Sequence, residues 1–223
     1  MTFRNNLTAA ELAELATATD SPSAMPQSAT ASVRDFTYEL LDLKLQDGTV
    51  PEVTFNDIDR YRAAYLYSTF DGSGPPAEGN NASGLGTISF SNADGSASAT
   101  TDEAFLSAKV NMKTHSGKAL ASRDLQFVLS PNTRLIITVT ADVFNTFGKF
   151  AGQGNAQTTL WASYHLDSAA TELVTVQSEM HTALGGSQRA LLSVVINSAN
   201  QQIEGTVTMT ASVDAVATAR SAR

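Results

Sequence analysis

Four aromatic residues are the side chains of this sequence best suited to contact a ligand. Tyr61, Tyr65 and Tyr67 are separated by even intervals, so they share one face of an extended segment. Trp161 is the single tryptophan and lies in another β-forming segment, close to Tyr164. Aromatic rings exposed on a flat sheet can stack on sugars, whereas buried rings belong to the core. The pattern favours a core position for Trp161, with a glycan-binding surface as the alternative.

Asp57, Asp59 and Asp71 are the candidate metal ligands. Asp57 and Asp59 lie two positions apart and share a face if that segment is extended. With Asp71 and the carbonyl groups of the loop after it, they offer oxygen ligands, of which Ca²⁺ takes six or more. The same aspartates also fit turns and strand ends beside Arg60 and Arg62. The sequence therefore predicts either a calcium site or ordinary charge pairs in this region.

No residue of the sequence is predicted to be catalytic. His115, His165 and His181 do not have the spacing of metal ligands and are expected to be structural or surface residues. No Gly-x-Ser-x-Gly motif is present, and the glycine-rich residues 148–154 lack the order of a phosphate-binding loop. The chain has no cysteine, which excludes disulfides, thiolate metal ligands and a thiol nucleophile. We therefore expect a protein that is not an enzyme and has no cofactor apart from the calcium considered above.

The composition excludes several classes of partner. The 223 residues carry a formal net charge of -8, and binding to nucleic acid or an anionic membrane needs clustered Lys and Arg. No apolar run approaches the roughly 18 residues of a membrane span, so membrane insertion is not expected. The length and the 42% hydrophobic residues allow a sizeable core.

Residues 33–217 carry the pattern of an all-β domain. Short β-forming runs alternate with turn signals, and residues 134–144 are the strongest run. A slip in the alternation between residues 33–40 and 41–45 predicts a bulge, and residues 71–81 predict a long exposed loop. The fold class expected is an antiparallel β-sandwich or jelly roll.

The two ends of the chain differ from this domain. Thr8 and Glu11 have the spacing of a capping box, which predicts a short helix as far as Thr19. Residues 20–32 are rich in Ser, Pro, Ala and Thr, which is typical of a linker. The predicted organisation is therefore a helix and flexible arm over residues 1–32, a sandwich over 33–217 and a disordered tail over 218–223.

Several segments resemble bacterial secreted proteins that carry a PEP-CTERM sorting signal. The resembling segments are residues 36–43, 47–55, 129–133, 135–143, 194–197 and 203–207. The resemblance implies an exported protein, extracellular or at the cell surface, that is associated with surface or matrix material, and it brings no catalytic residues. The sequence carries neither the sorting tail nor a signal peptide, so export is an expectation from the resemblance alone.

Three functional hypotheses follow, in decreasing order of support. The first is a non-enzymatic extracellular structural protein of a surface layer or matrix, which self-assembles through its N-terminal arm at an open sheet edge. The second is a glycan-binding module, with or without the help of calcium, that uses Tyr61, Tyr65, Tyr67 or Trp161. The third is a subunit of a virion or another assembly made in the cytoplasm. The partners expected are copies of the chain itself, surface or matrix components, or glycans.

Overall fold

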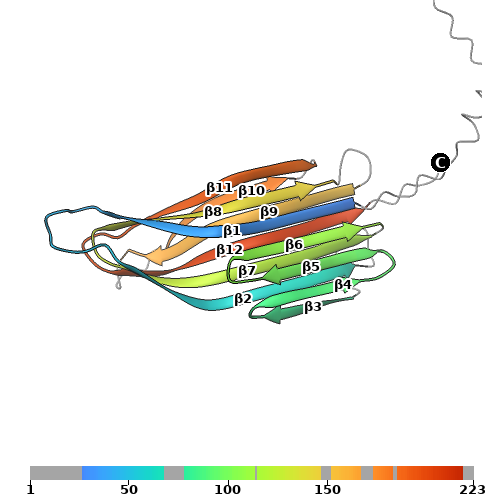
Figure 1. Ribbon diagram of the computed structural model, residues 1–223, viewed down its shortest axis with the longest axis horizontal. Helices are drawn as coiled ribbons and strands as arrows, with labels where there is room; N and C mark the ends of the chain where they lie inside the picture. The colour runs from blue at the N-terminus through green and yellow to red at the C-terminus, as the bar shows by residue number, and fades with distance from the viewer. Residues whose placement is uncertain are drawn as a thin grey trace, which may run out of the picture.

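The computed structural model describes residues 27–67, 78–113, 115–146, 152–166, 173–182 and 185–217. Within these ranges the chain forms twelve β-strands and no helix, and hence no helix that could cross a membrane. The strands build two antiparallel sheets that pack face to face (Figure 1). The predicted β-sandwich is confirmed, while the predicted helix, most of the arm and the tail lie outside the described residues.

Each sheet has six strands. The first, sheet A, has the order β11 (Gly186–Asn197), β8 (Thr133–Asn145), β1 (Gln27–Asp42), β6 (Phe105–Met112), β5 (Gly95–Thr101) and β4 (Gly86–Ser91). The second, sheet B, has the order β10 (Leu173–Thr182), β9 (Gly152–His165), β12 (Ile203–Ala217), β7 (Ser116–Leu129), β2 (Val53–Tyr67) and β3 (Glu78–Ser83). The first and last strands, β1 and β12, therefore both lie in the interior of their sheets.

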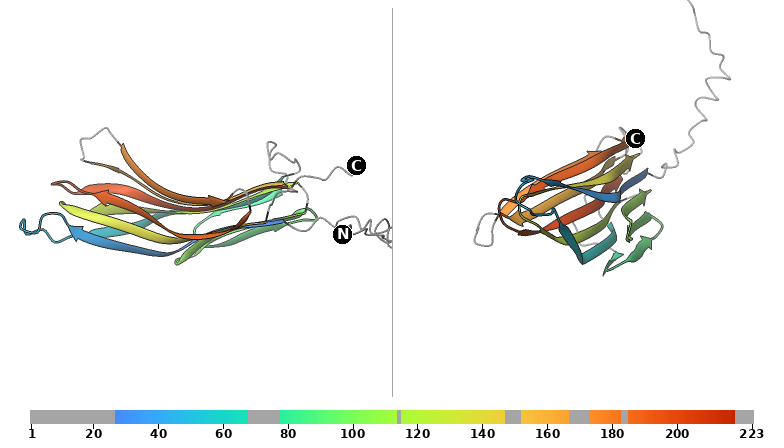
Figure 2. Two further views of the ribbon diagram at one scale, coloured as in Figure 1. Left: turned by 90° about the horizontal axis from the view of Figure 1, so that it is seen from above. Right: turned by 60° about the vertical axis from the view of Figure 1, so that its left-hand side comes forward.

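Sheet A narrows half-way along the elongated molecule. β6 pairs with β1 only from Gln27 to Arg34, and β5 ends at Thr101. Beyond the turn of residues 102–104, sheet A consists of β1, β8 and β11. We call the part of the molecule in which sheet A has all six strands the terminal half, because β1 begins and β12 ends there. The remainder of the molecule is the distal half (Figures 1 and 2).

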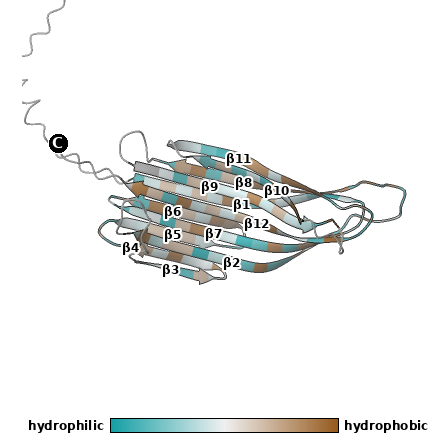
Figure 3. Ribbon diagram, turned by 180° about the vertical axis from the view of Figure 1, so that it is seen from behind, coloured by the Kyte–Doolittle hydropathy of each residue, from teal (hydrophilic) through white to brown (hydrophobic). Residues whose placement is uncertain are grey.

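The two halves have different cores. Hydrophobic and hydrophilic positions alternate along the strands, as a sandwich with one buried face per sheet requires (Figure 3). The inward positions of the terminal half are mostly alanine, with a few larger side chains among them: Ala29, Ala31, Ala64, Ala97, Ala99, Ala108, Ala119, Ala121, Ala141, Ala156, Ala211, Ala215. The inward positions of the distal half, apart from Ala162, are occupied mostly by large side chains: Phe127, Leu129, Leu135, Ile137, Leu160, Ile196, Ile203. Side-chain size thus changes where sheet A narrows.

Two segments that were predicted to be irregular belong to strands. β1 begins at Gln27 rather than at residue 33, because Ala29 and Ala31 face inward between outward-facing hydroxyl residues. The predicted loop of residues 71–81 extends too far, since Gly79 and the residues beside it pair with β2 as part of β3. β1 does contain a bulge, but the register with β8 shifts between Arg34 and Thr37 and is continuous from Thr37 to Asp42, so the predicted position near residues 40 and 41 was wrong.

A buried arginine ties the two sheets together in the terminal half. Arg62 points inward from β2 and is 5% exposed. Its guanidinium donates to Thr101 Oγ1 of sheet A at 2.9 Å, and to the carbonyl oxygens of Ser83 (3.3 Å) and Gly84 in the crossover to that sheet. Hydrogen bonds to several oxygens offset part of the cost of removing a charge from water.

Candidate functional site

Trp161 lies on the outer face of sheet B. The even-numbered residues of β9 from Gly154 to Tyr164 are buried, so the odd-numbered residues point away from sheet A. Trp161 is half-buried there and is not part of the hydrophobic core. The sequence-based preference for a core position was therefore wrong, because Trp161 is a partly exposed residue of the outer face.

The three tyrosines lie on the same outer face. Arg62 and Leu66 of β2 point inward, so Tyr61, Tyr65 and Tyr67 point outward. All three are half-buried. The structure thus brings the four predicted ligand-binding residues to one face of one sheet, although about a hundred residues separate them in the sequence.

Tyr61 and Tyr65 form a hydrogen-bonded network at the edge of this face. Asn81 Nδ2 of β3 donates to the Tyr65 hydroxyl at 3.1 Å. The hydrogen bond between Tyr65 and Tyr61, and then burial, raise the pKa of Tyr61. The Tyr65 ring also covers Gly79, because a Cβ atom there would lie 2.1 Å from Tyr65 Cδ1. These contacts hold both rings in place on the sheet.

Tyr67 is held by charged neighbours. Lys118 Nζ lies 5.7 Å from the centre of the Tyr67 ring and 3.0 Å from Asp214 Oδ2. The hydrogen bond to Asp214 raises the pKa of Lys118, against a smaller opposing effect of burial. This end of the face therefore combines a cation, a carboxylate and an aromatic ring.

Between Trp161 and the tyrosines the outer face of sheet B carries polar side chains in rows of directly paired residues. One row of directly paired residues crosses five strands from β10 to β2: Gln177, Trp161, Thr208, Asp124, Asp59. The next row is Glu179, Thr159, Thr210, Ser122, Tyr61. Trp161 and Tyr61 are three strands apart, or about 14 Å across the sheet. Hydroxyl groups fill most of the interval between the two rings.

The central row contains two facing carboxylates. Asp59 and Asp124 are directly paired on β2 and β7, and like charges at such positions repel each other. Asp124 Oδ1 is buried and has no hydrogen-bond partner among the described residues. Sequence inspection missed Asp124, since only the strand register brings it beside Asp59.

The predicted metal ligands are not gathered at one point. Residue 58 forms a bulge, so Asp57 pairs with inward-facing Leu125 while Asp59 pairs with Asp124. The expectation that Asp57 and Asp59 share a face was therefore wrong. Asp71 lies outside the described residues, and within the described ranges no three His, Asp or Glu residues come close enough together to hold a metal ion.

Asp57 instead joins two arginines at the point where sheet A narrows. Its Oδ2 accepts from Arg60 Nε at 2.8 Å and from Arg123 Nη2 at 3.0 Å. The same arginines donate to the carbonyl oxygens of Asp102 (3.1 Å) and Glu103 (3.0 Å) in the β5–β6 turn. Burial alone would raise the pKa of Asp57, but the hydrogen bonds and positive charges of both arginines outweigh it and lower that pKa. This cluster connects the sheets and is structural.

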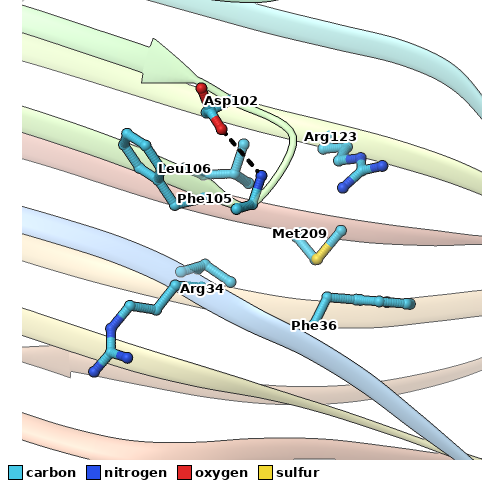
Figure 4. Close-up of a pocket in the computed structure, with 9 residues that line it drawn as sticks. Arg34, Phe36, Asp102, Phe105, Leu106, Arg123 and Met209 are labelled. Carbon is cyan, nitrogen blue, oxygen red and sulfur yellow. Dashed lines mark hydrogen bonds between the residues drawn. The ribbon is translucent and has the colours of Figure 1, made fainter.

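Two hollows lie beside the cluster. Figure 4 shows the smaller one, where the β5–β6 turn meets β1 and where Arg34, Phe36 and Arg123 lie around it. Its volume of about 10 Å³ suits one water molecule, so it cannot hold an organic ligand. The larger is an open groove of about 380 Å³ at the edge of sheet B, lined by Asp57, Ile58, Asp59, Arg60, Gly84 and Leu85. It lies next to the row of Tyr61, because Ser83, which pairs with Tyr61, directly precedes Gly84.

The chain matches no family model and no curated protein. Among solved structures, it has a weak likeness to the N-terminal tandem CBM22-1–CBM22-2 domain of Xyn10C from Paenibacillus barcinonensis, with 8% sequence identity and a TM-score of 0.17. The likeness covers 86% of this chain and 79% of that one. A similarity this small carries no conclusion on function.

Proposed function

We propose that the protein is a non-enzymatic β-sandwich that binds an extended glycan on the outer face of sheet B. The observation that carries this proposal is the presence of Trp161, Tyr61, Tyr65 and Tyr67 on one face. Their rings offer apolar surfaces for sugar rings, and the threonine, serine and aspartate side chains between them offer hydrogen bonds to sugar hydroxyls.

The spacing favours a chain of sugars over a single one. About 14 Å of sheet separates the strands of Trp161 and Tyr61, which is wider than one sugar ring. A ligand that spans this interval crosses Thr210 and Ser122, whose hydroxyl groups can hydrogen-bond to sugar hydroxyls. The open groove beyond Ser83 extends the same path at the sheet edge.

A fluorescence titration tests the proposal directly. Trp161 is the single tryptophan, so its emission reports on this face alone. Titration with soluble neutral, acidic and amino polysaccharides is expected to shift the emission with at least one class and to protect Trp161 from acrylamide quenching. Titration with Ca²⁺ and then with EDTA tests in the same assay whether calcium assists. Unchanged emission and quenching across the panel would contradict the proposal.

A matched pair of variants places the ligand on the correct face. Trp161→Ala should weaken binding by about thirtyfold, since a central tryptophan contributes about 2 kcal/mol or more to an interface. Phe144→Ala removes an aromatic residue that is 39% exposed on the outer face of sheet A, and it should leave the affinity unchanged. Affinity electrophoresis through the same polysaccharide measures both variants without tryptophan fluorescence.

The other hypotheses stay predictions. A structural role in a surface layer or matrix depends on the N-terminal arm of residues 1–32, and export or a cell-surface location depends on the PEP-CTERM resemblance. A virion or other assembly subunit made in the cytoplasm is the third hypothesis. Surface or matrix components as partners also stay a prediction.

A further inference from the structure

The four edge strands of the sandwich differ in how well they are protected. An edge strand presents unpaired backbone groups that can pair with a further strand. β3 and β4 have six residues each, which is too short for extensive pairing, and both contain glycine. β11 has twelve residues, contains neither lysine nor proline, and keeps one register with β8 from Gly186 to Asn197. It is the longest edge among the described strands, and beyond Gly186 at its start Arg189 is its single charged residue.

β11 also exposes large apolar side chains on its outer face. Leu191 is 71% exposed and Val195 is 42% exposed. Val195 pairs with the outward-facing Ile136 of β8, which extends the apolar surface away from the edge. A regular strand with a free edge and exposed apolar residues is a typical site for strand addition.

We propose that β11 pairs with β11 of a second copy of this chain, antiparallel around a two-fold axis at Ser193. In this register Leu191 lies opposite Val195 of the second copy, and the reverse pair forms at the same time. Arg189 lies opposite Asn197, so no like charges meet. Arg189 is already bound to Asp142 of its own chain and brings no uncompensated charge to the interface.

The geometry provides enough surface for a stable pair. β10 is the edge of sheet B on the same side of the sandwich as β11, so both sheets continue into the second copy (Figure 1). In this register the nine residues from Arg189 to Asn197 are paired and span about 31 Å, and two sheets about 10 Å apart give a strip roughly 20 Å deep. The resulting area, on the order of 600 Å² per copy or about 1,200 Å² in total, reaches the lower end of the range for specific interfaces. The outer face of sheet B stays open in this dimer, so the inference is independent of the proposed glycan site.

Light scattering coupled to size exclusion tests the dimer with the full chain. The wild type is expected at twice the 23.5 kDa chain mass. Leu191→Glu and Val195→Lys alone should each raise the dissociation constant by about tenfold or more, because the two-fold axis places every substitution in the interface twice. Leu45→Glu changes a residue that is 85% exposed in the β1–β2 loop, and it should leave the mass unchanged.

The double variant L191E/V195K tests the register itself. The new carboxylate at position 191 then faces the new ammonium group at position 195 of the other copy, so the dimer should be restored. Circular dichroism and thermal melting establish that every variant is folded. A monomeric wild type, single variants that remain dimeric, or folded single and double variants that are all monomeric would each overturn the proposal.

Discussion

The terminal and distal halves of the sandwich share the same long strands but are stabilised differently. In the terminal half, alanine lines the space between two complete sheets, and the Arg62 hydrogen bonds connect them. In the distal half, sheet A has lost three strands, and large aliphatic and aromatic side chains fill the core. Fully burying a Leu, Ile or Phe side chain contributes about 1.5–3 kcal/mol, which is much more than one alanine methyl group contributes. We therefore expect the half with fewer strands to contribute more to the free energy of unfolding than its number of strands suggests.

The largest effect is expected from a charge in the distal core. Ile137 is fully buried in β8, so Ile137→Asp places a carboxylate among apolar side chains with no partner. The loss should exceed about 4 kcal/mol and unfold the domain. Val139→Asp, one inward position closer to the terminal half, should do the same. Cooperative thermal melting retained in both variants would show that β8 is not central to the core.

Removing a large side chain should separate the two halves clearly. Phe127 and Ala121 are both fully buried and point inward from β7, Phe127 in the distal half and Ala121 in the terminal half. Phe127→Ala leaves a cavity and should cost about 3–5 kcal/mol. Ala121→Gly should cost about 1 kcal/mol, through lost burial and greater backbone freedom. Urea denaturation measures both, and equal costs would mean that the halves do not differ.

A smaller effect is expected at the junction of the halves. Asp57→Asn keeps the shape but removes the charge that Arg60 and Arg123 share. Because Asp57 is partly exposed, we expect a loss of about 1 kcal/mol at pH 7.

The pH dependence at Asp57 has a defined sign. Its pKa is lower in the folded than in the unfolded state, so its contribution is present above the unfolded value of about 3.9. That contribution disappears as the pH falls through the folded value. The gap in free energy of unfolding between wild type and Asp57→Asn should therefore close on acidification, and a gap that stays constant down to pH 2 would contradict the assignment.

The smallest effect is expected on the outer face of sheet B. Lys118→Met removes the ion pair with Asp214 and the contact with the Tyr67 ring, both at the surface. The free energy of unfolding should change by less than about 0.5 kcal/mol. A larger loss would mean that the surface of the terminal half compensates for its small core residues.

The sandwich itself could be predicted because alternation of apolar and polar residues is a local property. β8 has this pattern over its whole length, and its predicted boundaries differ from the observed ones by one residue at each end. β3 could not be found in this way, since Glu78-Gly79-Asn80-Asn81 is typical of a loop. Its strand conformation depends on pairing with β2 and on the Tyr65 ring that covers Gly79. Such contacts join separate segments and leave no local pattern.

The candidate site could also be predicted only in part, because some of its features depend on contacts between separate segments. The sequence suggested the aromatic residues, but the outward position of Trp161 depends on which residues of β9 face sheet A. Asp124 and the separation of Asp57 from Asp59 follow from one extra residue in β2. A bulge inverts the face of every residue after it, and the alternation of Asp57, Ile58 and Asp59 gives no sign of it.

The location of β1 and β12 has a mechanical consequence. β1 begins and β12 ends at the same end of the molecule, in facing layers (Figure 2). A force that pulls these two strand ends apart acts across the strands rather than along them. It would open the hydrogen bonds of each strand one after another, starting from the terminal half with its small core residues. The sandwich should therefore resist such a load weakly, whereas a load applied between the terminal end and the distal loops would act on many hydrogen bonds at once.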